Sequence, residues 1–434
     1  MKIQLKPRGE EGTALLITIT TALVLGIVIG SCLNMVATQN QSVARSQAWN
    51  TAIPAAEAGI EEAFSHYYRN TANLATEGWV LANGYYSKSR NLDARSSFAV
   101  GIKNVYPPLM IATGFVTVPM STTSKVARVV AIETMRFSPY SKAVVSMTYV
   151  DLNGKNVTAD SFDSTNSLYN TGGQYDKTKR KDNGDIASVL GVVDILSIGN
   201  AKVYGSLHTG PGGTASIGPN GSVGTTNYVD GGSKGIQTDH FADDINLSFP
   251  DVQVPFTSGY FTPGPGTISS NSYNYVLTNS APSTNYQLSS FDGTLYVAQS
   301  SVLYITGDAT IKGIVIAPGA IVKIYQGTKS GSAVGLKVAG NNTANSAGYA
   351  YQLRYYGLPS VQSIDLDGNA RYTGTIYAPQ AAISMNGSGN NVYDVTGAAV
   401  VKSVKMNGNF NFHYDEALSA WDEGFLAIKS WWEM

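Results

Sequence analysis

The chain contains 434 residues, 14% of them charged, and its 29 lysines and arginines are balanced by 30 aspartates and glutamates. This balance offers no surface that could neutralise phosphates, so nucleic-acid binding is not expected. Hydrophobic residues make up 43% of the chain, which excludes wholesale disorder. The 45 glycines favour short strands joined by tight turns, and the single cysteine excludes an internal disulfide.

The N-terminus predicts a leader followed by a membrane-spanning helix. Three basic residues lie in the leader, Lys2, Lys6 and Arg8. No charged residue follows from Gly12 to Ala44, and the segment Thr13 to Leu33 would span roughly 31 Å as a helix, the thickness of a bilayer core. The basic leader would remain cytoplasmic. A cleaved secretory signal peptide is the alternative, with cleavage near Ala44 or Ala48.

The periodicity beyond Leu33 predicts that the helix continues to residue 70. Apolar residues recur every three or four positions and would form one face for assembly with other subunits: Trp49, Ile53, Ala56, Ile60, Phe64 and Tyr67. Pro54 is the one expected kink. We therefore expect residues 13–70 to form a membrane anchor followed by an assembly surface.

The N-terminal region resembles type IV pilin-like proteins, in particular the minor-pilin group. The resemblance lies in a short basic leader that ends in Gly12, in the sequence TALLITI from Thr13, and in AAEAGIEEAF from Ala55 to Phe64. It implies that a prepilin peptidase removes residues 1–12 by cutting between Gly12 and Thr13, and that the partners are the membrane and other pilin-like subunits. Arg8-Gly9 is a weaker alternative cleavage site.

Two residues depart from the pattern of major pilins. Ile17 stands fifth after the predicted cut, where a major pilin has Glu, and Glu11 precedes Gly12 in place of Lys or Arg.

Residues 71–140 predict a small antiparallel sheet. Three runs rich in β-forming residues lie between 97 and 137 and are separated by Pro107-Pro108 and by a polar stretch at 120–124. Such a sheet could pack on the second half of the helix.

Internal repeats predict a parallel β-helix over residues 141–415. Three segments share a pattern of alternating apolar residues and glycines, Gly199–Gly210, Gly307–Pro318 and Gly368–Pro379. The glycines 368, 387 and 408 close shorter repeats about 20 residues apart, a period without room for a helix. Residues 225–300 are predicted to form a loop-rich insertion, and residues 416–434 a cap on the solenoid.

The C-terminal half also resembles an uncharacterised β-helical domain found behind pilin-like N-termini in bacterial envelope proteins. The matching segments are Asn407–Leu418 and Thr158–Ser164. The fold class expected for the whole chain is therefore mainly β, with a long N-terminal helix, a small antiparallel sheet and a parallel β-helix.

Acidic pairs are the candidates for carbohydrate chemistry, because polysaccharide-cleaving β-helices use convergent carboxylates. These pairs are Asp160 with Asp163, Asp243 with Asp244, Asp365 with Asp367, and Asp415 with Glu416. A structural role at the Gly368 turn is the simpler interpretation of Asp365 and Asp367. An N-cap is the simpler role of Asp415, with catalysis by His413 and Asp415 as the alternative. The basic run Lys177 to Lys181 is interpreted as a solvated loop, with contact to an anionic glycan or lipid as the alternative.

The function expected from the sequence is therefore non-enzymatic, without cofactor or metal. It is that of a single-pass inner-membrane protein whose exported β-helical domain serves pilus or pseudopilus assembly or adhesion, with the pilus or the cell surface as further locations and surface glycans as further partners. The alternative is an exported carbohydrate-active β-helix enzyme retained by its anchor.

Overall fold

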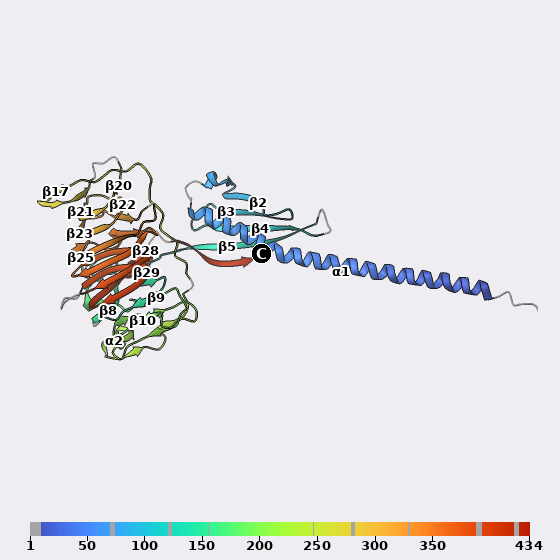
Figure 1. Cartoon of the computed structure of the whole chain (residues 1–434), viewed down its shortest axis with the longest axis horizontal. Coiled ribbons are helices and arrows are strands. Elements are labelled where there is room, and N and C mark those ends of the chain that lie inside the picture. The colour runs from blue at the N-terminus through green and yellow to red at the C-terminus, as the bar shows by residue number, and fades with distance from the viewer. Residues whose placement is uncertain are drawn as a thin grey trace, which may run out of the picture. The chain divides into compact units, whose positions relative to one another are not determined.

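The computed structural model describes residues 10–69, 74–119, 124–154, 156–245, 247–278, 283–328, 330–387, 393–420 and 425–434. The chain forms two compact units (Figure 1). The helix–sheet unit contains Met1–Phe137 and Phe425–Met434, and the solenoid unit contains Ser138–Gly424. The predicted fold class is confirmed, because the described residues are mainly β, with one long helix, a small antiparallel sheet and a large parallel sheet.

One helix, α1 (Glu10–Arg69), accounts for most of the N-terminal region and runs through Pro54. Every residue from Thr13 to Val43 is exposed, whereas from Ala44 onward one side of the helix is buried. The predicted leader lies largely outside the described residues, and the predicted cleavage site between Gly12 and Thr13 lies within α1.

The second half of α1 packs on one face of a sheet with the order β1-β2-β3-β4-β5-β31. A short 3₁₀ helix, η1 (Leu74–Glu77), joins α1 to this sheet. The strands are β1 (Val80–Ala82), β2 (Tyr85–Asn91), β3 (Ser96–Lys103), β4 (Leu109–Thr117), β5 (Lys125–Phe137) and β31 (Phe425–Glu433). Their pairings are antiparallel. The three predicted strands correspond to β3, β4 and β5, and β4 alternates regularly between buried and half-buried residues, as a strand with one covered face does.

The predicted C-terminal cap differs from the structure. β31 pairs with β5, so Phe425–Glu433 completes the small sheet, and Glu416–Ala420 forms the 3₁₀ helix η4 in the solenoid unit. The apolar pattern of the tail predicted a strand correctly, but a strand's pattern does not identify its partner.

The solenoid unit contains, in the described part of the chain, a sheet of 23 strands whose pairings are parallel. The strands up to residue 242 are β6 (Val144–Ser146), β7 (Val150–Asp151), β8 (Asn156–Phe162), β9 (Ile186–Ser188), β10 (Leu196–Ser197), β11 (Lys202–Tyr204), β12 (Leu207–His208), β13 (Ala215–Ser216), β14 (Ser222–Gly224), β15 (Gly235–Ile236) and β16 (Phe241–Ala242). Those from residue 275 are β19 (Tyr275–Leu277), β20 (Asn285–Leu288), β21 (Phe291–Val297), β22 (Ser301–Ile305), β23 (Ala309–Ile316), β24 (Val322–Gln326), β25 (Val334–Ala344), β26 (Leu353–Gly357), β27 (Val361–Gly368), β28 (Arg371–Asn386), β29 (Tyr393–Asn407) and β30 (Asn409–Asp415). Between and beside them lie η2 (Lys177–Lys179), α2 (Thr226–Asp230), η3 (Ala350–Gln352) and the hairpin of β17 (Gly266–Ile268) with β18 (Asn271–Tyr273).

Stacked side chains hold the coils together. One column of buried aliphatic residues in register runs through Leu336, Ile364, Ile383, Val404, Val150 and Leu196. At the coil corners the side chain of Asn386 donates to Asp367 at 3.1 Å, and Asn407 donates to Asn386 at 3.0 Å. Gly368 and Gly408 follow this ladder with φ of +75° and +78°, a conformation that favours glycine. The predicted repeat thus corresponds to the coils.

The coils do not stack in the order of the sequence. β29 and β30 pair with β6, β7 and β8, so the first coils of the unit lie against the last ones. The chain enters the stack in its middle, builds toward β16 at one end, and resumes from β19 at the other (Figure 1). The segment between β16 and β19 is therefore a crossover along the coils, attached where Tyr377 Oη donates to the Pro250 carbonyl at 2.7 Å. The predicted insertion at 225–300 is too wide, because its two ends supply coil strands.

Candidate functional site

The first candidate site is the exposed part of α1, residues 13–43, which we call the apolar segment. Fourteen large apolar side chains in it are each 50–65% exposed: Leu15, Leu16, Ile17, Ile19, Leu23, Val24, Leu25, Ile27, Val28, Ile29, Leu33, Met35, Val36 and Val43. α1 is the one helix among the described residues that is long and apolar enough to cross a membrane, a property that signal sequences share. So much exposed apolar surface requires a lipid or protein environment.

The threonines of the apolar segment are compatible with a lipid environment. Thr18 donates its hydroxyl to the Leu15 carbonyl at 2.8 Å, and Thr21 donates to the Ile17 carbonyl at 2.7 Å. Because the hydroxyls bond within the helix, they bring little unsatisfied polarity into a hydrocarbon phase. Cys32 is exposed on the same segment.

The predicted assembly face is largely used inside the chain, which corrects the prediction. Ala56, Ile60, Phe64 and Tyr67 pack in the core beneath the sheet. Ile53 is half-buried, and Trp49 is 49% exposed with the Arg128 guanidinium 4.3 Å from the centre of its ring. We predicted the packing face of the helix from the spacing of its bulky residues. The helix contacts the sheet mainly through small residues: Ala44, Ala48, Ala52, Ala55, Ala56, Gly59 and Ala63. Alanine and glycine contribute little to an apolar periodicity but allow close approach of backbones.

The acidic pairs bond mainly to turn and coil groups, and two of the pairs come together, since Asp163 lies close enough to Asp415 to contribute to its raised pKa. Asp163 accepts from the Thr165 amide at 2.9 Å, and Asp243 accepts from the Gly212 amide at 3.1 Å. Asp365 and Asp367 share the outer face of β27, where burial and the neighbouring Asp367 carboxylate raise the pKa of Asp365.

His413 pairs with Asp160. It does not pair with Asp415, the acidic residue that lies near it in the sequence. Asp415 accepts from the Ala417 amide at 3.2 Å, as a residue capping η4 does. Burial raises the pKa of Asp415, whose side chain lies inside the solenoid unit. The Asp160–His413 pair joins residues distant in sequence, so only the coil register brings it together.

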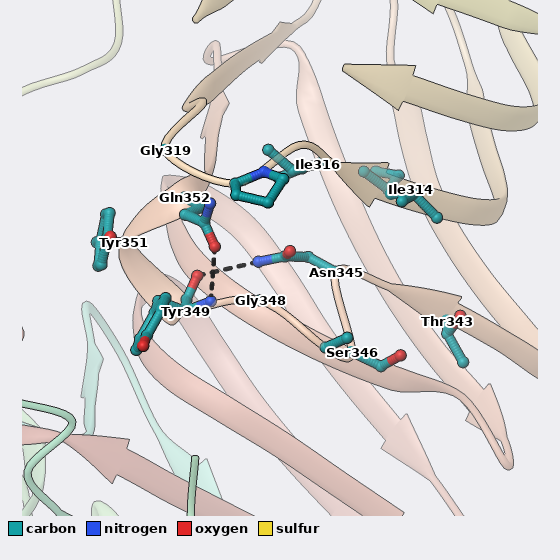
Figure 2. Close-up of a pocket in the computed structure, with 13 residues that line it drawn as sticks. Ile314, Ile316, Gly319, Thr343, Asn345, Ser346, Gly348, Tyr349, Tyr351 and Gln352 are labelled. Carbon is teal, nitrogen blue, oxygen red and sulfur yellow. Dashed lines mark hydrogen bonds between the residues drawn. The ribbon is translucent and has the colours of Figure 1, made fainter. Parts of the chain in front are cut away.

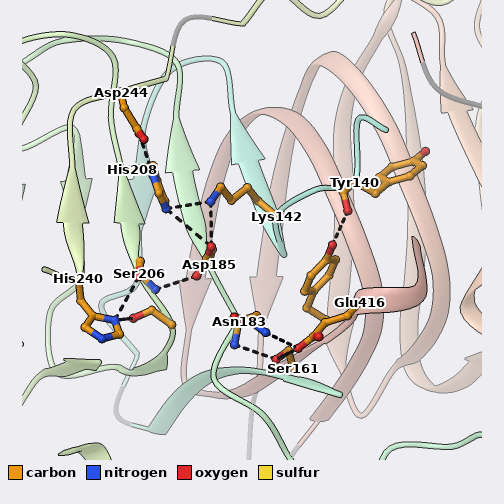
Figure 3. A network of polar contacts seen from close by, with 12 residues as sticks. Tyr140, Lys142, Ser161, Asn183, Asp185, Ser206, His208, His240, Asp244 and Glu416 are labelled. Atoms are coloured by element: carbon orange, nitrogen blue, oxygen red, sulfur yellow. Dashed lines mark hydrogen bonds and ion pairs between the residues drawn. The ribbon is translucent and has the colours of Figure 1, made fainter. Parts of the chain in front are cut away.

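A polar network joins successive coils around Asp185 (Figure 3). Lys142 Nζ lies 2.9 Å from Asp185 Oδ2 and 2.9 Å from His208 Nε2, and His208 Nδ1 lies 2.9 Å from Asp244 Oδ1. Burial alone would raise the pKa of Asp185, but the contacts with His208 and Lys142 lower it to about 2. Burial alone would lower the pKa of His208, and the nearby Asp185 and Asp244 carboxylates raise it. Asp244 begins the crossover, so this network attaches the crossover to the coils.

A second candidate site is the tyrosine cleft, a cavity of about 370 Å³ near η3 (Figure 2). Ile314, Ile316 and Pro318 form an apolar side. The rings of Tyr349 and Tyr351 stack with centroids 5.4 Å apart. The side chain of Asn345, at φ +56°, fixes the wall by donating to the carbonyls of Tyr349 at 3.0 Å and Thr373 at 3.1 Å.

A third candidate site is the basic cleft, a cavity of about 360 Å³ on the outside of the coils. Its walls come from three neighbouring strands and one loop: Thr158, Asp160, Tyr175, Lys177, Arg180, Lys202, Tyr204, Asn411 and His413. The basic run from Lys177 to Lys181, which we interpreted as a solvated loop, is therefore only partly solvated. Arg180 donates to both oxygens of Asp230 at 2.5 and 2.6 Å, and Lys179 Nζ donates to the Asn170 carbonyl at 2.6 Å.

Residues 299–421 match a family described as a domain of unknown function, DUF7305. No curated protein matches the sequence. Among solved structures, the chain is similar to the competence-associated pilin ComZ from Thermus thermophilus, with 11% identity, a TM-score of 0.23, and coverage of 88% of this chain and 96% of that one. At that score the similarity does not establish a shared fold.

Proposed function

We propose that this protein is a membrane-anchored, pilin-like envelope protein without enzymatic activity. The observation that supports the proposal is the division of α1, in which an exposed, uncharged segment continues directly into a segment covered by an antiparallel sheet. The apolar segment would lie in the inner membrane. The sheet and the solenoid unit would lie on the exported side, since the basic residues of the leader favour a cytoplasmic N-terminus.

The proposal includes removal of the leader by a prepilin peptidase, at the bond between Gly12 and Thr13. Mass spectrometry of the mature N-terminus, on protein isolated from membranes, tests it. A chain that begins at Thr13 agrees with the proposal. A chain that begins near Ala44 or Ala48 would have lost the apolar segment and would refute it.

The partners proposed are other pilin-like subunits, which would meet the apolar segment because the buried face of α1 is already occupied. A photo-crosslinking residue at Leu25, which is 54% exposed, should capture proteins that carry their own N-terminal apolar helix. The matched control is Leu190, which is 40% exposed on the solenoid unit. Equal capture of such proteins from both positions would contradict this assignment.

The solenoid unit would then be the displayed part of the protein, in a pilus, a pseudopilus or at the cell surface, with adhesion as its role. Its rigid coils present side chains at fixed spacing on their outer faces, because each coil is in register with the next.

A further inference from the structure

The floor of the basic cleft is an ordered grid of outward side chains on β30, β8 and β11. In the outer row, Asn411, Thr158 and Lys202 are register partners across the three strands. In the inner row, His413 pairs in register with Asp160. Parallel strands lie about 4.8 Å apart, so each row presents its functional groups at a fixed spacing along the stack.

The loop between β8 and β9 closes the inner row. The ring of Tyr175 stacks on His413 with centroids 3.5 Å apart, and its hydroxyl donates to Asp160 Oδ2 at 2.6 Å. His413 Nδ1 lies 2.6 Å from Asp160 Oδ1. Asp160 is fully buried, so the carboxylate has its hydrogen-bond partners inside the wall.

Arg180 forms the other side of the wall. Its guanidinium lies 3.9 Å from the centre of the Tyr204 ring and is neutralised by Asp230. Burial and the hydrogen bond from its hydroxyl to Asp230 raise the pKa of Tyr204, so the phenol stays protonated. The charge of Arg180 is therefore balanced within the wall by Asp230.

The mouth of the basic cleft carries excess positive charge. Lys177 and Lys202 are exposed there, and among the described residues neither forms a close ion pair, although Lys202 is near enough to Asp230 to help lower the pKa of that carboxyl. An ammonium group without a carboxylate partner is suited to bind an external one. Asn411 and Thr158, half-buried in the row that ends at Lys202, provide an amide and a hydroxyl that can donate to and accept from sugar hydroxyls.

We propose that the basic cleft binds a sugar that carries a carboxylate. The carboxylate would lie between Lys177 and Lys202, and the ring hydroxyls would contact Asn411 and Thr158. A volume of about 360 Å³ is at the lower end of small-molecule sites, which fits one or two sugar units. The biological role of this site rests on the proposed display of the solenoid unit. Binding of the sugar itself does not depend on the membrane anchor.

Calorimetry on the full-length chain in detergent micelles tests the proposal, with galacturonate oligosaccharides, neutral galactose oligosaccharides and inorganic phosphate as probes. The acidic oligosaccharide should bind, and its affinity should fall with salt. Lys177→Gln combined with Lys202→Gln should weaken binding by about tenfold or more. The control is Lys312→Gln on β23, an exposed lysine that pairs with Asp292 outside the basic cleft.

The outcomes separate the possibilities. Absence of binding to the acidic oligosaccharide would refute the proposal, as would equal affinity for the neutral one. Phosphate that binds as tightly as the acidic oligosaccharide would show a general anion site and refute the sugar assignment. A wild-type affinity in the double variant, with its circular dichroism spectrum unchanged, would refute the placement of the carboxylate. None of these outcomes depends on where the mature N-terminus begins, so failure here is distinct from failure of the proposed anchor.

Discussion

The packing of α1 on the sheet depends on Gly114 in β4, and the substitution Gly114→Ala tests this packing. A Cβ added at Gly114 would lie 2.1 Å from the Ala52 carbonyl oxygen and 2.5 Å from the Ala56 amide nitrogen. Ordinary contact distances for a carbon atom are about 3.5 Å, so helix and strand would have to separate by roughly 1 Å. Both obstructing atoms belong to the helix backbone, which cannot rotate away as a side chain can.

The expected cost lies at the upper end of the range for overpacking, about 3 kcal/mol in the free energy of unfolding of the helix–sheet unit. Without the clash, Gly→Ala in a strand would be slightly stabilising, by about 0.5 kcal/mol, so even the sign of the effect is diagnostic. Gly101→Ala in the neighbouring strand β3 is the matched control, because its added Cβ would lie 3.4 Å from the Tyr85 ring, at ordinary contact.

Urea unfolding of the full-length chain in detergent, followed by tryptophan fluorescence, measures the difference. Trp79 lies in the core of the helix–sheet unit with 3% exposure, so its emission reports on the unfolding of this unit. The midpoint should fall strongly for Gly114→Ala and hardly at all for Gly101→Ala. If both variants unfold at the same urea concentration, the close approach of α1 to β4 is wrong.

Four further predictions concern the membrane, pH and the tyrosine cleft. Leu25→Arg should reduce membrane retention, measured by carbonate extraction, because a central arginine costs roughly 3 kcal/mol on insertion; wild-type retention would contradict a membrane-spanning apolar segment. The pKa of Asp185 is lowered to about 2 from an unfolded value near 3.8. Its contribution of about 2 kcal/mol to the free energy of unfolding is therefore present above pH 4 and is lost as the pH falls toward 2. Urea unfolding followed by circular dichroism should show that wild type loses stability more steeply with acid than Asp185→Asn does. His208 acts in the opposite sense, since its raised pKa gives stability below about pH 6.5 that disappears as the pH rises through the folded value, and His208→Gln should abolish this dependence. Asn345→Ala should lower the melting temperature more than Asn345→Gly, because both variants lose the hydrogen bonds to Tyr349 and Thr373 but only alanine is also strained at φ +56°. Equal melting temperatures would contradict the strain.

Local patterns in the sequence predicted the elements of the fold well. The uncharged run predicted the exposed half of α1, alternation predicted β3, β4 and β5, and the spaced glycines 368, 387 and 408 predicted the coil corners. These features depend on periodicity and on turn chemistry, both of which are written in short windows of sequence.

Long-range pairing could not be predicted in the same way. Nothing in β31 identifies β5 as its neighbour, and the stacking of β29 on β6 reverses the order expected from successive repeats. The basic cleft depends on this stacking, because Asp160 and His413 become neighbours only when the last coil meets the first. The sequence singled out both residues but assigned them to separate pairs, since sequence distance was the only measure of proximity.

The pairing of β31 also determines how the two units are connected. Phe425 is the register partner of Phe137, so the chain leaves the small sheet and returns to it at adjacent positions of β5 and β31. The solenoid unit is therefore an insertion between two neighbouring strands, with both of its ends in the middle of the coil stack. If the solenoid unit were unfolded, pairing β5 with β31 would require the entropic cost of closing a long loop. A folded solenoid unit already holds its two ends close together, which removes most of this entropic cost. Folding of the solenoid unit and completion of the sheet that covers α1 should thus be coupled, even though each unit has its own core.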